Sequence, residues 1–520
     1  MNRWQNVNAI YQIYPRSFYD ANGDGVGDIR GIIQKLDYLK GDENGLGVDA
    51  IWLSPVYTSP MADYGYDVAD YRDIDPDFGT LDDMKELIAK AHERGMKVMM
   101  DIVPNHTSNQ HEWFKKSRES RDNPYRNYYI WRDPKEDGSA PNNWRSQFFG
   151  GAWEFDDTTG QYYLHNFMKE QPDLNWENPK VREEMNDILR FWMELGVDGF
   201  RADAVWALSK DMEFRDEPDG GHMRTQYGPK LQSYLREMAE VVAEYEDRII
   251  IFENYTDNPA ADNRDHYREL YDVYPGVAYP FNFDGMRTAW GAASFKEHVT
   301  RFHEWLNEGE RLVYCLSNHD QPRMVSRFGE LQARLLGMFQ LTLPGLPTFY
   351  NGDEIGMPNG TVQPGQGRDV GSLDNPMNGR DPERTPLQWN NEAHAGFTSG
   401  TPWLPVGDSY HDINVAKQQA NDNSFLRLYH QLLKLRSDYA AFRTGNMIIL
   451  GSTADIFAYE CTDVDSAFII LLNFGDYEQE VFATYDGKVV CGTQPEYLPQ
   501  IAPDGHVRLH AFEGIVVKIR

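Results

Sequence analysis

The sequence has few cysteines and no long apolar run. Its 520 residues include three cysteines, Cys315, Cys461 and Cys491, too few for a disulfide framework in a chain of this length. No apolar run approaches the roughly 18 residues that span a bilayer. The first residues lack the apolar core and the cleavage site of a secretory signal. We therefore expect a cytoplasmic protein with no membrane partner.

Positive charge is also scarce. Lysine and arginine number 50 against 81 acidic residues, which gives a net charge of −31. An acidic surface repels nucleic-acid phosphates and anionic membranes. We therefore expect no nucleic-acid partner, and either a neutral or cationic small-molecule ligand or a charge that serves solubility alone. The aromatic fraction of 13% suits stacking on sugars and suits a large packed core equally.

Short apolar, strand-like runs alternate with amphipathic helical segments. The helical segment 80–95 has Thr80 as its N-cap, Asp83 at the capping-box spacing and Gly95 just beyond its end. Eight strands alternating with helices predict a parallel (β/α)8 TIM barrel of the α/β class. The strand-like runs are 9–15, 49–55, 97–106, 197–205, 248–254, 277–283, 311–320 and 346–354.

Three segments depart from this alternation. Residues 107–175 have no clean period and are predicted to form an inserted subdomain, and the Gly- and Pro-rich residues 357–405 a partly irregular lid. Short alternating strands from residue 448 onward predict a C-terminal antiparallel β-sheet domain. The predicted domains are therefore the barrel at 1–106 and 176–447, the subdomain at 107–175 and the β domain at 448–520.

Ionisable residues gather at the ends of four predicted strands, where a barrel carries its catalytic groups. Mutual repulsion of several carboxylates at one rim should raise at least one pKa, as a general acid requires. Two carboxylates about 5 Å apart, one ionised and one protonated, carry out retaining glycoside hydrolysis. The strand-end residues are Asp101, Asn105, His106, Arg201, Asp203, Glu253, His319 and Asp320.

Arg201 and Asp203 lie two residues apart, on one face of a strand. We expect the arginine to hold the pKa of Asp203 low, so that the carboxylate is ionised and can attack a sugar carbon. The alternative is a structural ion pair in the barrel interior. The other carboxylates at the same rim favour the catalytic interpretation.

Four motifs in this order resemble those of glycoside hydrolase family 13, the α-amylase superfamily: "DIVPNH" (101–106), "GFRADAV" (199–205), "FEN" (252–254) and "SNHD" (317–320). "QPDLNW" (171–176) resembles the fifth motif of this family. Four further stretches resemble its α-glucosidase and oligo-1,6-glucosidase branch: "YQIYPRSFYDANGDGVGDIRGI" (11–32), "YGYDVADY" (64–71), "ERTPLQW" (383–389) and "HAGFTSGTPW" (394–403).

The resemblance implies a role for each matching residue. Asp203 would be the nucleophile, Glu253 the acid/base and Asp320 a third carboxylate that grips sugar hydroxyls, with no organic cofactor. The stretch "IIIFENYTD" around Glu253 departs from the branch, which more often has Gly or Val before the glutamate. Implied substrate contacts are Asp63, Tyr66, His106, Phe167, Arg201, His319 and Arg384.

Ala204 follows the nucleophile directly. Strand alternation predicts that its side chain leaves on the opposite face and shapes the wall near the scissile bond. In the branch that this sequence resembles, valine at this position accompanies α-1,6 preference and smaller residues accompany acceptance of α-1,4 links. We therefore expect α-1,4 links to be accepted. The alternative is that Ala204 only packs, and that the 357–405 segment sets specificity.

The stretch "DANGDGVGD" (20–28) places oxygen donors at regular spacing: Asp20, Asn22, Asp24 and Asp28, with the carbonyl of Val26. It resembles the structural calcium or magnesium loop of the same branch. The alternative is a polar turn capped by its own Asp side chains.

The sequence thus predicts a retaining, exo-acting α-glucosidase that releases terminal glucose from short oligosaccharides or glucosides. A transglucosylase or a sucrose or maltose isomerase would use the same glucosyl-enzyme. A third alternative, a non-enzymatic transporter-associated subunit of the same fold, is disfavoured, because such subunits have a membrane segment and lack catalytic carboxylates.

Overall fold

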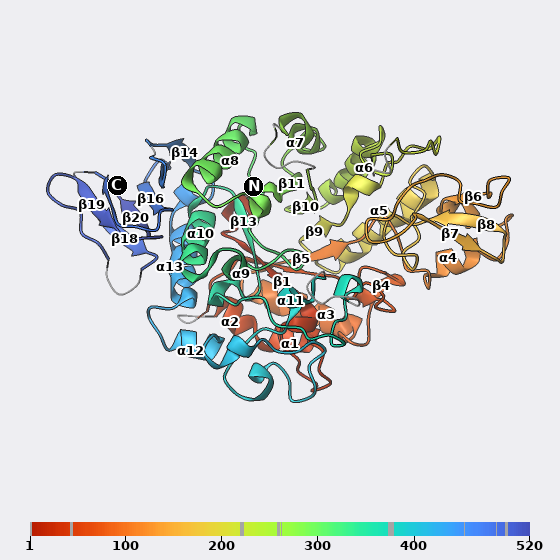
Figure 1. Cartoon of the computed structure of the whole chain (residues 1–520), viewed down its shortest axis with the longest axis horizontal. Coiled ribbons are helices and arrows are strands. Elements are labelled where there is room, and N and C mark those ends of the chain that lie inside the picture. The colour runs from red at the N-terminus through yellow and green to blue at the C-terminus, as the bar shows by residue number, and fades with distance from the viewer. Residues whose placement is uncertain are drawn as a thin grey trace.

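Eight parallel strands form a closed barrel in the computed structural model, which describes residues 3–41, 45–218, 223–256, 261, 263–372, 379–451, 453–484, 486–494 and 498–520. Each predicted strand-like run contains one barrel strand, so the predicted fold class is confirmed (Figure 1). In barrel order the strands are β1 (Ile10–Ile13), β13 (Leu346–Tyr350), β12 (Val313–Tyr314), β11 (Ala278–Asn282), β10 (Ile249–Phe252), β9 (Gly199–Ala202), β5 (Lys97–Ile102) and β2 (Ala50–Leu53).

The barrel strands are buried almost throughout, as expected for parallel strands covered on both faces. Register brings the site together, because Asp101 of β5 pairs with Arg201 of β9, and Arg201 pairs with Ile251 of β10. Charged side chains from neighbouring strands therefore meet at the same end of the barrel.

Helices cover the outside of the barrel. As predicted, Thr80 caps α3 in a capping box with Asp83, and Gly95 has a φ of 68° just beyond the helix. The helices are α1 (Ile29–Gln34), α2 (Leu36–Lys40), α3 (Leu81–Glu93), α4 (Glu112–Ser117), α5 (Pro179–Glu194), α6 (Leu231–Ala243), α7 (Arg264–Tyr271), α8 (Ala292–Trp305), α9 (Met324–Phe328), α10 (Glu330–Thr342), α11 (Asp381–Arg384), α12 (Val415–Gln419) and α13 (Phe425–Asp438).

Two smaller units lie at opposite ends of the molecule (Figure 1). Residues 107–175 carry α4 and a sheet of order β6-β8-β7, made of β6 (Trp131–Arg132), β7 (Trp153–Asp156) and β8 (Gln161–Leu164). The C-terminal unit has a sheet of order β14-β15-β16-β20-β18 and a β17-β19 pair: β14 (Asn446–Ile449), β15 (Ile456–Thr462), β16 (Ala467–Asn473), β17 (Gln479–Phe482), β18 (Lys488–Gly492), β19 (His506–Leu509) and β20 (Gly514–Lys518).

The remaining segments are short. β3 (Tyr57–Thr58) and β4 (Asp70–Ile74) pair after β2. The expected lid at 357–405 contains α11 and short 3-10 turns, and its residues 373–378 lie outside the described residues. Within the described ranges, no helix is long and apolar enough to cross a membrane.

Candidate active site

Arg201 holds three carboxylates at the carboxyl end of the barrel. Its Nη1 lies 2.7 Å from Asp101 Oδ1 and 2.6 Å from Asp203 Oδ1, and its Nη2 lies 3.1 Å from Glu253 Oε1. The Arg201 side chain is only 1% exposed. We call Arg201, Asp101, Asp203 and Glu253 the Arg201 cluster. The predicted residues Arg201, Asp203 and Glu253 are therefore brought together.

Burial and mutual repulsion govern the acids of this cluster. Burial raises the pKa of Asp101 to about 7, although Arg201 lowers it. The pKa of Asp203 is also raised, by burial first and by the Glu253 charge second, while Arg201 opposes both. The expected low pKa of Asp203 is therefore wrong, because one guanidinium is shared among three acids. The expectation that at least one pKa rises is confirmed.

Asp320 has the opposite surroundings. Its Oδ1 lies 2.8 Å from Arg384 Nη2 and 3.2 Å from Arg380 Nη1, and its Oδ2 lies 3.3 Å from His319 Nε2. Burial acts to raise the pKa of Asp320, but His319, Arg380 and Arg384 together hold it well below its usual range. Asp320 is therefore a fixed anion.

Arg380 extends this second group to Asp63. Its Nη2 lies 2.7 Å from Asp63 Oδ1 and 2.5 Å from Asp369 Oδ1. Gln171 Nε2 donates to the other oxygen of Asp63 at 3.1 Å. We call Arg380, Arg384, Asp63, Asp320 and Asp369 the Arg380 cluster.

Sequence reasoning assigned no role to Arg380, Asp369 or Gln171. Arg380 and Asp369 lie in the long segment after β13, where no strand pattern places them. Gln171 lies inside the quoted motif "QPDLNW", so that motif was the available signal.

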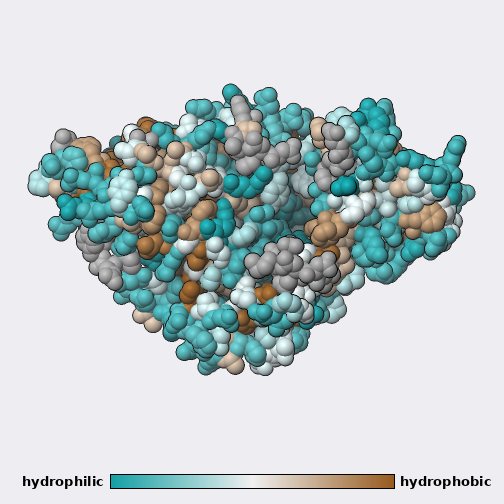
Figure 2. Space-filling model, viewed as in Figure 1, coloured by the Kyte–Doolittle hydropathy of each residue, from teal (hydrophilic) through white to brown (hydrophobic). Residues whose placement is uncertain are grey.

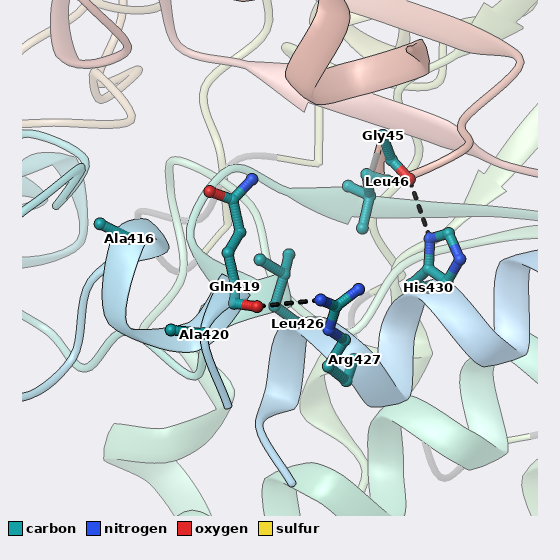
Figure 3. Close-up of a pocket in the computed structure, with 8 residues that line it drawn as sticks. All are labelled: Gly45, Leu46, Ala416, Gln419, Ala420, Leu426, Arg427 and His430. Carbon is teal, nitrogen blue, oxygen red and sulfur yellow. Dashed lines mark hydrogen bonds between the residues drawn. The ribbon is translucent and has the colours of Figure 1, made fainter. Parts of the chain in front are cut away.

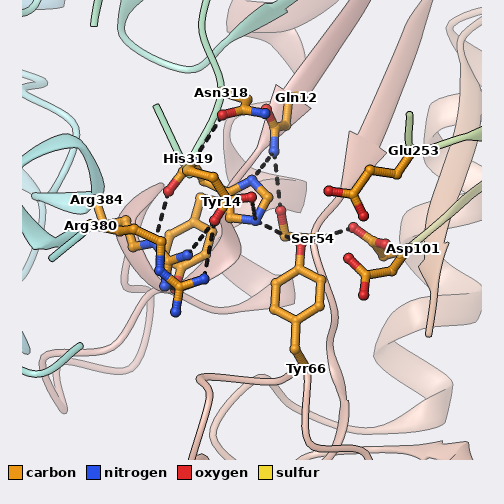
Figure 4. Close-up of polar contacts among 12 residues, drawn as sticks. Gln12, Tyr14, Ser54, Tyr66, Asp101, Glu253, Asn318, His319, Arg380 and Arg384 are labelled. Carbon is orange, nitrogen blue, oxygen red and sulfur yellow. Dashed lines mark hydrogen bonds and ion pairs between the residues drawn. The ribbon is translucent and has the colours of Figure 1, made fainter. Parts of the chain in front are cut away.

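His319 and Tyr66 connect the two clusters. Gln12 Nε2 lies 2.8 Å from His319 Nδ1, and the Tyr66 hydroxyl lies 2.7 Å from His319 Nε2 and donates to Asp101 Oδ2 at 3.1 Å. The Tyr66 and His319 rings stack at 5.5 Å with an interplanar angle of 3°. Burial lowers the pKa of His319 well below its usual value, so the imidazole is neutral. Figure 4 shows Tyr66 between His319 and Asp101.

His106 and Phe167 lie beside the Arg380 cluster. His106 Nε2 lies 3.1 Å from Gln171 Nε2 and 3.1 Å from the Tyr66 carbonyl, and burial lowers its pKa. The Phe167 ring lies 5.0 Å from the His106 ring. The predicted contact residues other than Ala204 lie on β9 or α11, or in the loops that follow β3, β5, β8 and β12.

Ala204 is placed differently from the prediction. β9 ends at Ala202, and Ala204 has φ 43° and ψ 36°, so strand alternation does not reach it. Its side chain is 2% exposed, and its backbone N–H donates to Glu253 Oε2. The opposite-face argument is therefore wrong, since Ala204 is part of the turn that holds the acid.

The 20–28 loop is closed by its own hydrogen bonds. Asp20 accepts from the backbone of Asn22, Gly23 and Gly25, and Asp28 caps α1 through Gly31. Within the described residues, no group of three or more His, Cys, Asp or Glu side chains is arranged to hold a metal ion. The donors are nevertheless all oxygens, which suits a hard cation, so the metal remains a prediction.

Figure 2 shows a hollow near the middle of the face that it draws, between the barrel and the inserted subdomain. A separate pocket of about 340 Å³ lies at α12 and α13 (Figure 3). No carboxylate lines that pocket among the described residues. Its lining residues are Gly45, Leu46, Ala416, Gln419, Ala420, Leu426, Arg427 and His430.

Comparisons with known proteins match the whole chain. The family model for the catalytic domain of alpha amylase matches residues 12–445. An oligo-1,6-glucosidase from Parageobacillus thermoglucosidasius is 41% identical, over 99% of each chain. Maltase 1 of Drosophila virilis is 39% identical, over 99% of this chain and 87% of its own. The crystal structure of a trehalulose synthase from Pseudomonas mesoacidophila MX-45 aligns with a TM-score of 0.90 at 36% identity, over 99% of each chain.

Proposed function

The chain belongs to the α-amylase family of glycoside hydrolases, and from this membership and its site we propose that it is a retaining α-glucosidase. It removes a terminal α-glucose from short oligosaccharides or glucosides through a covalent glucosyl-enzyme. The observation that carries the proposal is Arg201 in contact with both Asp203 and Glu253. This contact keeps two carboxyls close together, one as nucleophile and one as acid.

The Arg201 contacts favour Asp203 as the nucleophile and Glu253 as the acid. Arg201 lies closer to Asp203 (2.6 Å) than to Glu253 (3.1 Å), so it stabilises negative charge on Asp203 more strongly. In the proposed mechanism Glu253 protonates the glycosidic oxygen as Asp203 attacks the anomeric carbon. Glu253 next removes a proton from water, and water displaces Asp203 from the sugar.

The Arg380 cluster supports attack at a chain end. Asp63 and Asp320 are both held by Arg380. Two carboxyl groups and a guanidinium in fixed positions offer acceptors and donors to the hydroxyls of one glucose ring. Asp320 stays ionised, so it accepts hydrogen bonds from sugar hydroxyls throughout the reaction. These groups would bind the non-reducing glucose.

Transfer to a sugar is the second candidate. The resemblance to a trehalulose synthase favours it, because interception of the glucosyl-enzyme by a sugar needs no change in the catalytic pair. We propose hydrolysis as the main activity, since the curated relatives described above are named as glucosidases. We also propose that α-1,4 links are cut, as the name of the maltase relative suggests.

One product analysis tests both candidates. Maltose, isomaltose and sucrose are each incubated with the full chain, and proton NMR follows the products over time. The anomer is read from sucrose, whose other product is fructose, because the reducing-end glucose of maltose and isomaltose is already a mixture of anomers. Retention predicts that the glucose first released from sucrose is the α-anomer, before mutarotation. β-Glucose as the first glucose released from sucrose contradicts a retaining mechanism. Dominant disaccharide products at low substrate concentration favour the transferase.

A structural cation forms a further part of the proposal. Ca²⁺ or Mg²⁺ would be held by oxygens of Asp20, Asn22, Asp24 and Asp28 with the Val26 carbonyl. It would tie the loop together and take no part in bond breaking. The loop lies against a second segment, because Trp403 N donates to the Gly25 carbonyl at 3.0 Å. Chelation should lower the melting temperature, while an unchanged value in metal-free buffer after demonstrated removal contradicts the proposal.

We propose a cytoplasmic location as well. All three cysteines are buried free thiols, as expected in a reducing compartment. Cell fractionation with activity assays tests this location.

A further inference from the structure

The motif "HAGFTSGTPW" (394–403) packs along the 20–28 loop. Trp403, its last residue, donates its backbone N–H to the Gly25 carbonyl at 3.0 Å. A β-carbon on Gly25 would lie 1.8 Å from the Thr401 carbonyl oxygen, so the two backbones are in direct contact. The loop and this segment therefore form one packed unit, although they are far apart in the sequence.

The Trp403 side chain approaches the active site by two routes. Its indole N–H donates to Ser17 Oγ at 3.0 Å, and the Ser17 hydroxyl donates in turn to the Arg384 carbonyl. Its ring lies 5.3 Å from the Tyr64 ring, and Tyr64 directly follows Asp63 in the sequence. Asp63 and Arg384 both belong to the cluster that would bind the terminal glucose. One indole therefore supports two members of that cluster from behind.

A third route runs through Tyr14. The Trp403 and Tyr14 rings are 6.2 Å apart, and Tyr14 stacks on His319 at 5.6 Å with an interplanar angle of 20°. The Arg384 guanidinium lies over the same Tyr14 ring at 5.3 Å. Figure 4 shows Tyr14 beside His319. The tyrosine thus carries contacts from Trp403 to a histidine that lies 3.3 Å from Asp320.

Tyr64 has a backbone conformation that needs such support. Its φ is 47°, a left-handed value that is costly for a side chain of this size. Residues held in this way persist only where the surrounding structure fixes them. The Tyr64 hydroxyl donates to the Arg368 carbonyl at 3.0 Å, and Arg368 Nε donates to the Trp403 carbonyl at 3.3 Å. Trp403 therefore holds Tyr64 both by ring contact and through Arg368.

We propose that Trp403 is a positioning residue that couples the 20–28 loop to the binding of the terminal glucose. Its backbone holds the loop, and its indole supports the residues behind Asp63 and Arg384. Ordering of the loop would strengthen sugar binding, and by thermodynamic linkage sugar binding would order the loop to the same extent. The proposal rests on the glucosidase function above, because it needs glucose to bind at the Arg380 cluster.

Hydrogen exchange measures this coupling without relying on turnover. The full chain is transferred to D₂O with and without saturating glucose, and mass spectrometry follows the peptide that covers residues 20–28. Two amides of this loop, those of Asn22 and Gly25, donate to the Asp20 carboxylate and report its opening. In wild type, glucose should slow the exchange of this peptide by roughly fivefold or more, the lower end of usual coupling between two sites.

Trp403→Leu should remove the coupling. The 20–28 peptide should then exchange at the same rate with and without glucose. The inhibition constant of glucose against maltose hydrolysis should rise by roughly fivefold or more, since the linkage acts equally in both directions. Trp403→Phe keeps an aromatic ring but loses the donor to Ser17, so it should keep only part of the protection by glucose.

Trp290→Leu is the matched control. Trp290 is also half-buried, and its indole N–H donates to the Phe474 carbonyl at 3.2 Å. Its ring packs on Phe328 and Phe512, at the contact between the barrel and the C-terminal unit. This variant should keep the protection by glucose and the wild-type inhibition constant, even where its melting temperature falls as far as that of Trp403→Leu.

The outcomes separate this coupling from the glucosidase function. If glucose inhibits wild type without slowing exchange of the 20–28 peptide, or if Trp403→Leu keeps the protection, the coupling is overturned and the glucosidase function stands. If Trp403→Leu does not fold, Trp403→Phe decides, and protection equal to that of wild type in this variant overturns the coupling. A wild type that neither binds glucose nor cleaves maltose contradicts the glucosidase function, and this proposal with it.

Discussion

The Arg201 and Arg380 clusters place the same kind of side chain in opposite electrostatic states. The Asp203 side chain is 12% exposed and that of Asp320 is 20% exposed, so both are largely buried. The pKa of Asp203 is nevertheless raised and that of Asp320 lowered. Three acids share one guanidinium around Asp203, whereas the guanidinium groups of Arg380 and Arg384 both face Asp320. The balance of charge therefore decides the direction of the shift, with burial acting to raise both.

The opposite electrostatic states of the two clusters suit the chemistry of a retaining glycosidase. A retaining glycosidase needs one proton to be available beside the scissile bond and a fixed anion to hold the sugar. The Arg201 cluster has too little positive charge to keep all its acids ionised. The Arg380 cluster has enough to keep Asp320 ionised.

The largest expected effect comes from Asp203→Asn. The amide is nearly isosteric but is not a nucleophile, so kcat should fall by at least about 10⁴-fold. Stopped assays on maltose measure this loss. A value of kcat near that of wild type would remove Asp203 from its role.

Asp203→Asn also tests the comparison between the clusters. The substitution removes one acid from the Arg201 cluster and none from the Arg380 cluster. Asp101 should then titrate at lower pH, because Arg201 is shared among fewer acids. Its carboxyl signal in a ¹³C NMR pH titration reports this change. An unchanged Asp101 midpoint contradicts the shared-cation explanation.

Arg380→Leu should have the next largest effect. It removes a cation from both Asp63 and Asp320, so kcat/KM for maltose should fall roughly 100- to 1,000-fold. The pKa of Asp320 should rise toward its usual value. The acid limb of the kcat/KM profile should therefore move to higher pH.

A surface arginine controls for loss of charge alone. Arg121→Leu removes a half-exposed partner of Asp133 in the inserted subdomain and should leave the profile unchanged. If Arg380→Leu lowers kcat/KM with no movement of the acid limb, Arg380 does not set the Asp320 pKa.

Ala204→Val is expected to disturb only the Arg201 cluster. A β-branched residue at φ 43° is strained, and the site is almost fully buried. Strain and overpacking together should lower the free energy of unfolding by roughly 3 kcal/mol. Ala204→Gly should be tolerated at this φ, which makes it the matched control. Urea unfolding measures the free energy of unfolding of both variants. If Ala204→Val is as stable as wild type, the turn geometry is contradicted.

Much of the fold could be predicted because local signals agreed with one another. Thr80, Asp83 and Gly95 marked α3, and each strand-like run had the length and apolar character of a buried parallel strand. The candidate acids Asp203 and Glu253 could be placed together because barrel strands end at one rim. The position of Arg380 could not be predicted, because it depends on how a segment without a periodic pattern crosses that rim. The Asp203 pKa was misjudged because a sequence shows neighbours along the chain, and the opposing charges of Glu253 and Asp101 come from other strands.

Glu354 tests the effect of burial on a pKa apart from the effect of neighbouring charges. Its substitution should give the smallest effect on the protein. This carboxyl is fully buried and accepts from the Tyr11 hydroxyl (2.8 Å), the Tyr38 hydroxyl (2.7 Å) and Gly352 N (2.7 Å). Burial raises its pKa to about 6 against those hydrogen bonds. The folded protein thus keeps a proton that the unfolded chain has already lost, so stability falls as pH rises from about 4.5 to about 6.

Glu354→Gln is neutral in both states and should abolish that part of the pH dependence. Between pH 4.5 and 6.5, wild type should lose about 1.5 kcal/mol more of its unfolding free energy than the variant does. Urea titrations at intervals of pH measure the two slopes. The glutamine will shift the whole curve, because an amide accepts less well from three donors, so the slope and not the offset is diagnostic. Parallel curves would show that the three donors already offset burial, and that an acid in this protein needs a neighbouring acid, as Asp203 has, before its pKa rises.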